Sequence, residues 1–248
     1  AKTTHHAVFN SLEHDDVALY FGAWGANRGE LWLGDVKLEE VGLLNVVRRN
    51  GAPLNIKRTD GAWLVEGKDF EHVADPRMGC VPWPGAFEVW HEPPAIKVHA
   101  PDGTRLLVSY HHAITVHDGQ VMICPSEAKT LDLLRDEARR VHELFGNRAF
   151  FMSHDEIRVL NQDLACRRRK LDAGALVADN VRACIGILRA VDPKAELYVW
   201  SDMFDPTHNA HAGYYLVRGD LAGSWEGLDS SVVVANWNFG EREKSLAF

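Results

Sequence analysis

The second half of the chain alternates between amphipathic helices and short apolar strands, and this alternation limits the fold more than any other feature. Apolar residues at helical spacing predict two helices, over 126–145 and 173–191, begun by Ser126 and Asp172. Near-continuous apolar runs predict strands at 149–153, 197–200 and 232–235. Strands that alternate with helices form parallel sheets through right-handed crossovers. The predicted class is therefore α/β, with a parallel sheet covered on both faces.

The length of this region limits how much of a barrel it can form. A closed (β/α)8 TIM-type barrel takes about 250 residues, whereas the barrel-like pattern begins only at an apolar run over 106–110 and continues to residue 248. Residues 106–248 are therefore predicted to form a partial (β/α)8 TIM-type barrel, with an open α/β sheet as the alternative.

The first part of the chain has a β-type pattern. Short apolar runs at 7–9, 17–21 and 30–33, separated by turn residues, predict a β-sandwich-like segment over 1–42. Within it, Trp24 and Trp32 are either a sugar-stacking platform or core residues. Residues 43–105 are interrupted repeatedly by Pro and Gly, which predicts an irregular β-rich connecting region.

Composition and motifs exclude several classes of protein. A net charge of −8 argues against a nucleic-acid partner, because phosphate binding needs a basic face. No apolar run approaches the roughly 20 residues of a membrane span. The four cysteines form no C-x-x-C pair and are interpreted as free thiols. The absence of a phosphate loop and of G-x-G-x-x-G predicts no nucleotide cofactor. The chain opens without Met, so we expect a fragment whose targeting signal, secreted or periplasmic, would lie upstream.

Polar and aromatic residues gather where each predicted strand of the second half ends. The strand at 149–153 runs into Ser153-His154-Asp155-Glu156, the next into Trp200-Ser201-Asp202, and the last into Asn236-Trp237. Because the carboxyl ends of barrel strands form the active face, these clusters are expected to converge on one pocket. Carboxylates with indole walls suit sugars, since glycoside hydrolysis needs an acid for the leaving oxygen and a group that stabilises the cationic centre.

The strand that ends in Asp155-Glu156 resembles the fourth strand of family 20 glycoside hydrolases, the β-N-acetylhexosaminidases. The later strands that end in Trp200 and Trp237 are similar to the tryptophan-lined sugar pocket of that family. The resemblance implies that Glu156 is the general acid and that Asp155 orients a substrate 2-acetamido group, which acts as internal nucleophile. The family has Gly-Gly where this chain has Ser153-His154. Its pocket Arg has no evident match, and Tyr214 and Tyr215 are candidates for its acetamido-binding Tyr.

The predicted function is glycoside hydrolysis, with carbohydrate as partner, no cofactor and no metal, and with residues 1–42 resembling a carbohydrate-binding module. Asp155 and Glu156 are the predicted catalytic residues. The predicted substrate-binding residues are His154, Trp200, Asp202, Asp205, Trp225, Glu226, Asn236 and Trp237.

Each of these assignments has an alternative. Asp155-Glu156 could cap a helix, Asp202 and Asp205 could shape a turn, and Glu226 could lie in a loop. The protein could bind carbohydrate without cleaving it. It could also be a metal-dependent hydrolase, with ligands drawn from His154, Asp155, Asp202, Asp205, His208 and His211. The remaining histidine cluster, His111, His112 and His117 with Asp118, is either a set of ligands or structural.

Overall fold

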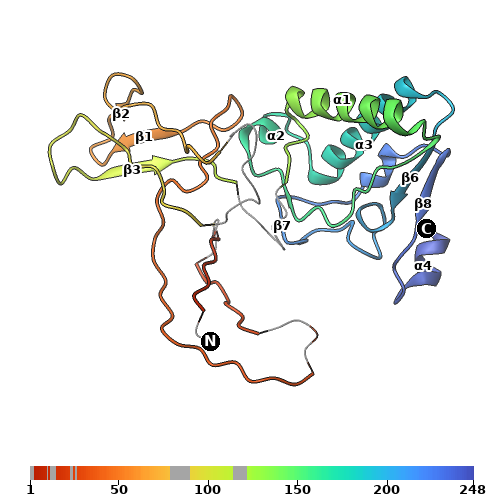
Figure 1. Ribbon diagram of the computed structural model, residues 1–248, viewed down its shortest axis with the longest axis horizontal. Helices are drawn as coiled ribbons and strands as arrows, with labels where there is room; N and C mark the ends of the chain where they lie inside the picture. Colours follow the sequence, from red (N-terminus) through yellow and green to blue (C-terminus); the bar gives the residue numbers. More distant parts are fainter. Residues whose placement is uncertain are drawn as a thin grey trace. The chain divides into compact units, whose positions relative to one another are not determined.

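The computed structural model describes residues 3–9, 11, 15–22, 25, 27–78, 90–113 and 122–248 (Figure 1). The chain divides into two compact units. The first unit comprises Ala1–Val47 and Asn55–Thr115, and the second comprises Arg48–Leu54 and Val116–Phe248. Among the described residues, no helix is long and apolar enough to cross a membrane.

The first unit contains a small antiparallel sheet in the order β2-β1-β3. The strands are β1 (Asn55–Arg58), β2 (Trp63–Leu64) and β3 (Leu106–Ser109). Ile56 of β1 is fully buried and lies in register with Val108 of β3. A buried carboxylate, Asp75, accepts the backbone N–H of Asn45 and faces His91 Nε2 at 2.8 Å. The unit is therefore stabilised by the hydrogen bonds of this small sheet and by buried side chains from its loops.

Two expectations for the first half need correction. The described residues at 7–9, 17–21 and 30–33 contain no strand, and Tyr20 and Trp32 are 92% and 88% exposed. Alternating apolar residues make a strand only where a partner strand and a core face are available. The run at 106–110 does form a strand, but β3 pairs antiparallel with β1 and belongs to the first unit instead of the parallel sheet. Trp24 lies outside the described residues.

The second unit contains the predicted parallel sheet, in the order β4-β6-β8. Its strands are β4 (Ala149–Phe151), β6 (Glu196–Trp200) and β8 (Val232–Ala235), and both pairings are parallel. A second parallel pair joins β5 (Val159–Leu160) to β7 (Leu216–Val217). The strands predicted at 149–153, 197–200 and 232–235 are therefore confirmed within one or two residues.

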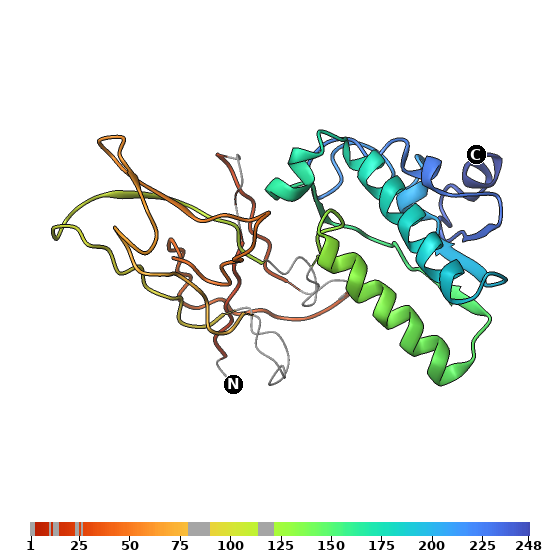
Figure 2. The ribbon, with the colours of Figure 1, turned by 90° about the horizontal axis from the view of Figure 1, so that it is seen from above.

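Two long helices lie side by side along one face of this sheet (Figures 1 and 2). They are α1 (Ala128–Phe145) and α3 (Ala173–Val191), and α3 begins at Asp172 as predicted. The N-cap of α1 is Glu127, one residue after the predicted Ser126, and its side chain makes no capping bond. The shorter helices are α2 (Leu164–Arg168), α4 (Arg242–Ala247) and the 3-10 turns η1 (Asp202–Phe204) and η2 (Ser224–Gly227).

Burial alternates along β4 and β6 of this sheet. Phe150, Leu197 and Val199 point into the core with the buried side of α3. On the opposite side, Phe151 and Val233 are about half exposed. Coverage of both faces was predicted, whereas the helices lie on one face in the part of the chain described. The apolar runs were continuous because the second face also carries aromatic and β-branched residues.

Candidate functional site

The candidate site lies where the parallel strands of the second unit end. Each of β4, β6 and β8 is followed at its carboxyl end by one of the predicted polar clusters. Since the strands run parallel and are adjacent, their carboxyl ends meet at one edge of the sheet. The polar segments that follow them are therefore neighbours in space, although they are separated by about 40 residues in the sequence.

Asp202 connects these segments. Its side chain is completely buried. One carboxylate oxygen accepts the backbone N–H of Glu156 at 2.8 Å and the side-chain amide of Asn209 at 3.0 Å. The other accepts the indole N–H of Trp237 at 3.3 Å. A buried carboxylate is tolerated when several donors satisfy it, and here the donors follow β4, β6 and β8.

The two predicted catalytic residues differ in their surroundings. Asp155 is exposed. Glu156 is about one-third exposed, and its carboxylate pairs with the guanidinium of Arg158 at 2.5 Å. Arg158 is itself buried and lies over the ring of Tyr215. No helix starts after β4 until α2, whose N-cap is Asp163, so Asp155-Glu156 does not cap a helix.

The backbone of this turn has an unusual conformation. Ser153, His154 and Glu156 all have positive φ angles, of 59°, 58° and 47°. This left-handed region is uncommon for residues with a Cβ atom and costs on the order of 1–3 kcal/mol per residue. Such strain persists only where the surrounding structure holds it in place. Here the backbone N–H of Trp200 donates to Ser153 O, and Asp202 holds Glu156 N.

His154 holds this turn in place through contacts of both its ring nitrogens. Its Nδ1 lies 3.0 Å from Met152 O and its Nε2 lies 3.0 Å from the side-chain amide of Asn180. Burial lowers the pKa of His154, although its hydrogen bonds and the nearby Asp155 act in the opposite direction. The ring is therefore neutral near pH 7 and orients the turn.

Asp205 shapes the loop after η1. Its side chain accepts both the backbone N–H and the hydroxyl of Thr207, each at 2.7 Å. Burial would raise the pKa of Asp205, but hydrogen bonds from Ser245, Thr207 and Asn238 lower it below its ordinary value. This pattern matches the turn role that the sequence left open.

The remaining predicted residues lie around these strand ends with different partners. Trp200 packs against Phe151, and Trp237 meets the ring of His208 edge-on. Asn236 accepts the backbone N–H of Asn238. On η2, Trp225 packs edge-on against Phe248 and Glu226 is exposed.

The described part of the predicted histidine cluster belongs to the first unit. His111 and His112 belong to the first unit, where Val47 N donates to His111 O and His112 forms a bridge with Val46. His117 and Asp118 lie outside the described residues.

Comparisons with protein-family models, with curated proteins and with solved structures found no match. The candidate function therefore depends on the geometry of the site and on the resemblance of its residues.

Two features of the second unit were not found from the sequence. The first is the ion pair between Arg158 and Glu156, whose opposite charges two positions apart in the sequence were the available signal. The second feature is a group of three side chains with converging ligand atoms, Cys124, Asp163 and Cys166. It is the one such group in the part of the chain that the structure describes, and it shares no residue with the six metal ligands considered from the sequence.

Proposed function

We propose that the second unit carries a glycoside hydrolase site, with Glu156 as general acid and Asp155 as the carboxylate that orients the substrate. The observation that carries this proposal is the bonding of Asp202, whose carboxylate accepts both Glu156 N and Trp237 Nε1. The backbone of Glu156 and the indole of Trp237 follow two different strands, and one buried carboxylate thus holds both of them. Carbohydrate is the partner that suits this combination, because an indole ring packs on a sugar face while carboxylates act at the glycosidic bond.

The chemistry follows from these positions. Glu156 would donate its proton to the glycosidic oxygen as the bond from that oxygen to the anomeric carbon breaks. A sugar ring stacked beside Trp237 would exclude water from the reacting bond. Asp155 is exposed and would orient a 2-acetamido group, whose carbonyl oxygen attacks the anomeric carbon. Arg158 would hold Glu156 in place between turnovers.

The backbone at Ser153-His154 supports the family resemblance. These residues stand where family 20 enzymes have Gly-Gly, and both adopt the left-handed conformation that glycine favours. Both positions therefore have a backbone conformation that glycine would also adopt readily. His154 uses its side chain to fix that shape, through Met152 and Asn180.

The arrangement of the sheet supports a partial barrel. In a (β/α)8 barrel the helices cover the outside of the sheet and the inner face is lined by large side chains. Here α1 and α3 lie on one face (Figure 2), and the other carries Phe151, Tyr198 and Trp200, whose rings pack in succession. The bare aromatic face would be the inner face of the barrel.

A panel of aryl glycosides, including an N-acetyl-β-glucosaminide, tests the proposal. Glu156→Gln keeps the size and hydrogen-bonding capacity of the side chain but removes the acid, so turnover should fall by roughly 10²–10⁴-fold with sugar binding retained. Glu137→Gln, on the exposed side of α1, is the matched control and should keep full turnover. Unfolding curves of both variants check that the fold is intact.

Other outcomes decide between the alternatives. Sugar binding without turnover in the unaltered chain would make the protein a carbohydrate-binding protein. Loss of turnover on addition of a chelator, with the circular dichroism of the fold unchanged, would favour a metal-dependent hydrolase. Equal turnover in Glu156→Gln and the unaltered chain would exclude Glu156 as the acid.

A further inference from the structure

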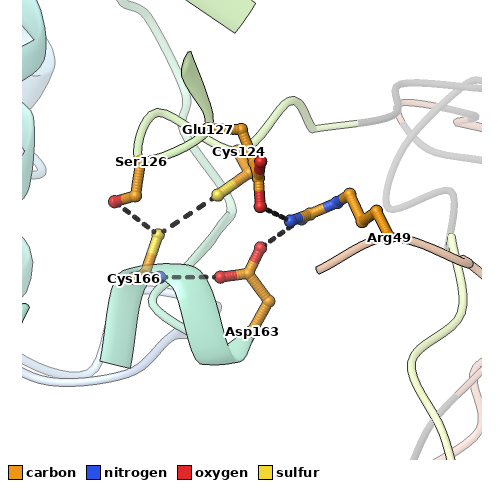
Figure 3. Close-up of polar contacts among 6 residues, drawn as sticks. All are labelled: Arg49, Cys124, Ser126, Glu127, Asp163 and Cys166. Carbon is orange, nitrogen blue, oxygen red and sulfur yellow. Dashed lines mark hydrogen bonds and ion pairs between the residues drawn. The ribbon is translucent and has the colours of Figure 1, made fainter. Parts of the chain in front are cut away.

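A second cluster of reactive side chains lies at the start of α1 and α2, and it has no part in the proposed hydrolysis. Figure 3 shows Cys124 and Cys166 with their sulfur atoms facing each other and the carboxylate of Asp163 beside them. The two sulfur atoms are 3.6 Å apart. One ligand atom from each of the three residues lies within 4.8 Å of the other two. All three residues belong to the second unit.

The distance between the two sulfur atoms fits a shared metal ion better than it fits a disulfide. Two thiolates bound to one tetrahedral zinc ion, with Zn–S bonds of about 2.3 Å, lie roughly 3.8 Å apart. A disulfide would need about 2.05 Å. The observed 3.6 Å is close to the first geometry, and a disulfide would not explain why a carboxylate converges on the same point.

The two thiols contact each other, and the hydroxyl of Ser126 contacts the sulfur atom of Cys166. Hydrogen bonds from Cys124 and then Ser126 lower the pKa of Cys166, against the effect of burial. The pKa of Cys124 is raised, chiefly by its hydrogen bond to Cys166 and by burial. A divalent ion binds thiolates, so it would displace the protons of both thiols.

Asp163 is held ready beside the sulfur atoms. One of its oxygens accepts the backbone N–H of Cys166 at 2.9 Å, and the other pairs with the guanidinium of Arg49, which also pairs with Glu127 (Figure 3). Each carboxylate oxygen has a second lone pair that remains available. Arg49 also limits the negative charge that two thiolates and a carboxylate would otherwise place in a half-buried site.

We propose that Cys124, Asp163 and Cys166 bind a zinc ion. The protein would supply two thiolates and one carboxylate oxygen, and water beside the Ser126 hydroxyl would complete the tetrahedron. Ser126 Oγ lies 3.2 Å from the sulfur of Cys166. Because Cys124 precedes α1 and the other two ligands belong to the first turn of α2, the ion would link the two helices.

Cobalt(II) is the probe for this site, since it takes the place of zinc and absorbs light when thiolates bind it in a tetrahedral site. The full chain, reduced and stripped of metal, is titrated with Co²⁺ alone. We expect one equivalent to produce the thiolate-to-cobalt absorption in the near ultraviolet together with visible bands of tetrahedral cobalt. Zinc should then abolish both, and zinc should raise the midpoint of thermal unfolding.

Single substitutions identify the ligands. Cys124→Ser and Cys166→Ser should each remove the thiolate absorption of the two-sulfur site or weaken it at least tenfold. Asp163→Asn can still cap α2, and it should weaken binding without loss of the fold. Cys184→Ser is the matched control, because Cys184 lies in α3 outside the cluster, and it should bind cobalt as the unaltered chain does.

Three results would overturn the proposal. The first is the absence of a thiolate absorption in the unaltered chain. The second is equal loss of that absorption in Cys184→Ser. The third is a thiol count, in protein kept without reductant and denatured, of two for the unaltered chain with its four cysteines and of three for each cluster variant. That count would assign Cys124 and Cys166 to a disulfide. Circular dichroism of each metal-free variant separates lost binding from lost folding.

Discussion

The backbone N–H of Glu156 donates to the buried carboxylate of Asp202 across 2.8 Å. The first residue follows β4 and the second begins η1 after β6, so one hydrogen bond joins two strand ends. Asp202 needs no solvent contact for this task, because Asn209 and Trp237 supply the other donors. The position of the proposed acid is therefore fixed through its main chain, while its side chain is held separately by Arg158.

Replacement of this anchor should cost both stability and activity. Asp202→Asn replaces one of the two acceptor oxygens with an NH2 group. That group cannot accept a hydrogen bond, so at least one N–H that now donates to Asp202 loses its acceptor. An unsatisfied buried group costs about 1–3 kcal/mol, so the free energy of unfolding in urea should fall by that amount. Turnover of aryl glycosides should fall at least tenfold, because the backbone of Glu156 loses its support.

Asp155→Asn is the control for stability. The side chain of Asp155 is exposed, so the same chemical change should alter the free energy of unfolding by less than about 0.5 kcal/mol. If both variants unfold at the same urea concentration as the unaltered chain, Asp202 does not anchor the turn.

The pKa of His154 predicts how stability depends on pH. Burial lowers this pKa in the folded protein below the ordinary value of 6.5. As the pH falls below about 6.5, the unfolded chain takes up a proton at His154 before the folded chain does. The stability contributed by the neutral ring is therefore complete above pH 6.5 and is lost as the pH falls toward the folded pKa.

His154→Gln removes this titration and keeps an amide that can form hydrogen bonds. Urea unfolding at pH 7.5 and pH 5.5 should show a smaller loss of stability on acidification for His154→Gln than for the unaltered chain. His211→Gln, the same substitution at an exposed histidine, is the matched control. Identical pH dependence in all three proteins would mean that His154 titrates as an exposed histidine does.

Two glycines of the second unit should respond in opposite ways to a methyl group. A Cβ atom on Gly51 would lie 2.6 Å from Cβ of Ala165 and would also meet the ion pair of Arg49 with Glu127. Gly51→Ala should therefore destabilise by about 1–3 kcal/mol. A Cβ atom on Gly186, in the middle of α3, would meet nothing within 4 Å. Gly186→Ala should stabilise by about 0.5–1 kcal/mol, because alanine is the better helix former.

Chemical unfolding of the two glycine variants provides the measurement. A Gly51→Ala protein as stable as the unaltered chain would show that the turn at residue 51 moves away from α2 at little cost. A destabilised Gly186→Ala protein would show that the exposed side of α3 is covered in solution.

Local sequence patterns were sufficient for the elements of the second unit. Helix α3 and strand β8 appear at the predicted residues, because each combines the right periodicity with a clear start or stop. The strand-end clusters also followed from the sequence, since parallel strands bring their carboxyl ends to one edge. The partial barrel and the hydrolase remain proposals.

Contacts between distant segments could not be predicted in the same way. Cys124 and Cys166 are 42 positions apart with no repeated spacing, so nothing in the sequence indicated that they would face each other. The same holds for the alternating runs before residue 42, where the pattern was typical of strands but pairing depends on a partner. The role of Asp202 as an anchor depends on three hydrogen bonds that only the folded chain creates.

The short segment Arg48–Leu54 makes the second unit discontinuous in sequence. Gly51 O accepts the backbone N–H of Leu164, and Arg49 pairs with both Glu127 and Asp163. A protein made of residues 116–248 alone would therefore lack these hydrogen-bond and ion-pair contacts, which the remaining residues cannot replace. A useful minimal version would carry residues 48–54 joined to residue 116 by a flexible linker, whose length matters only weakly for the entropy of closure.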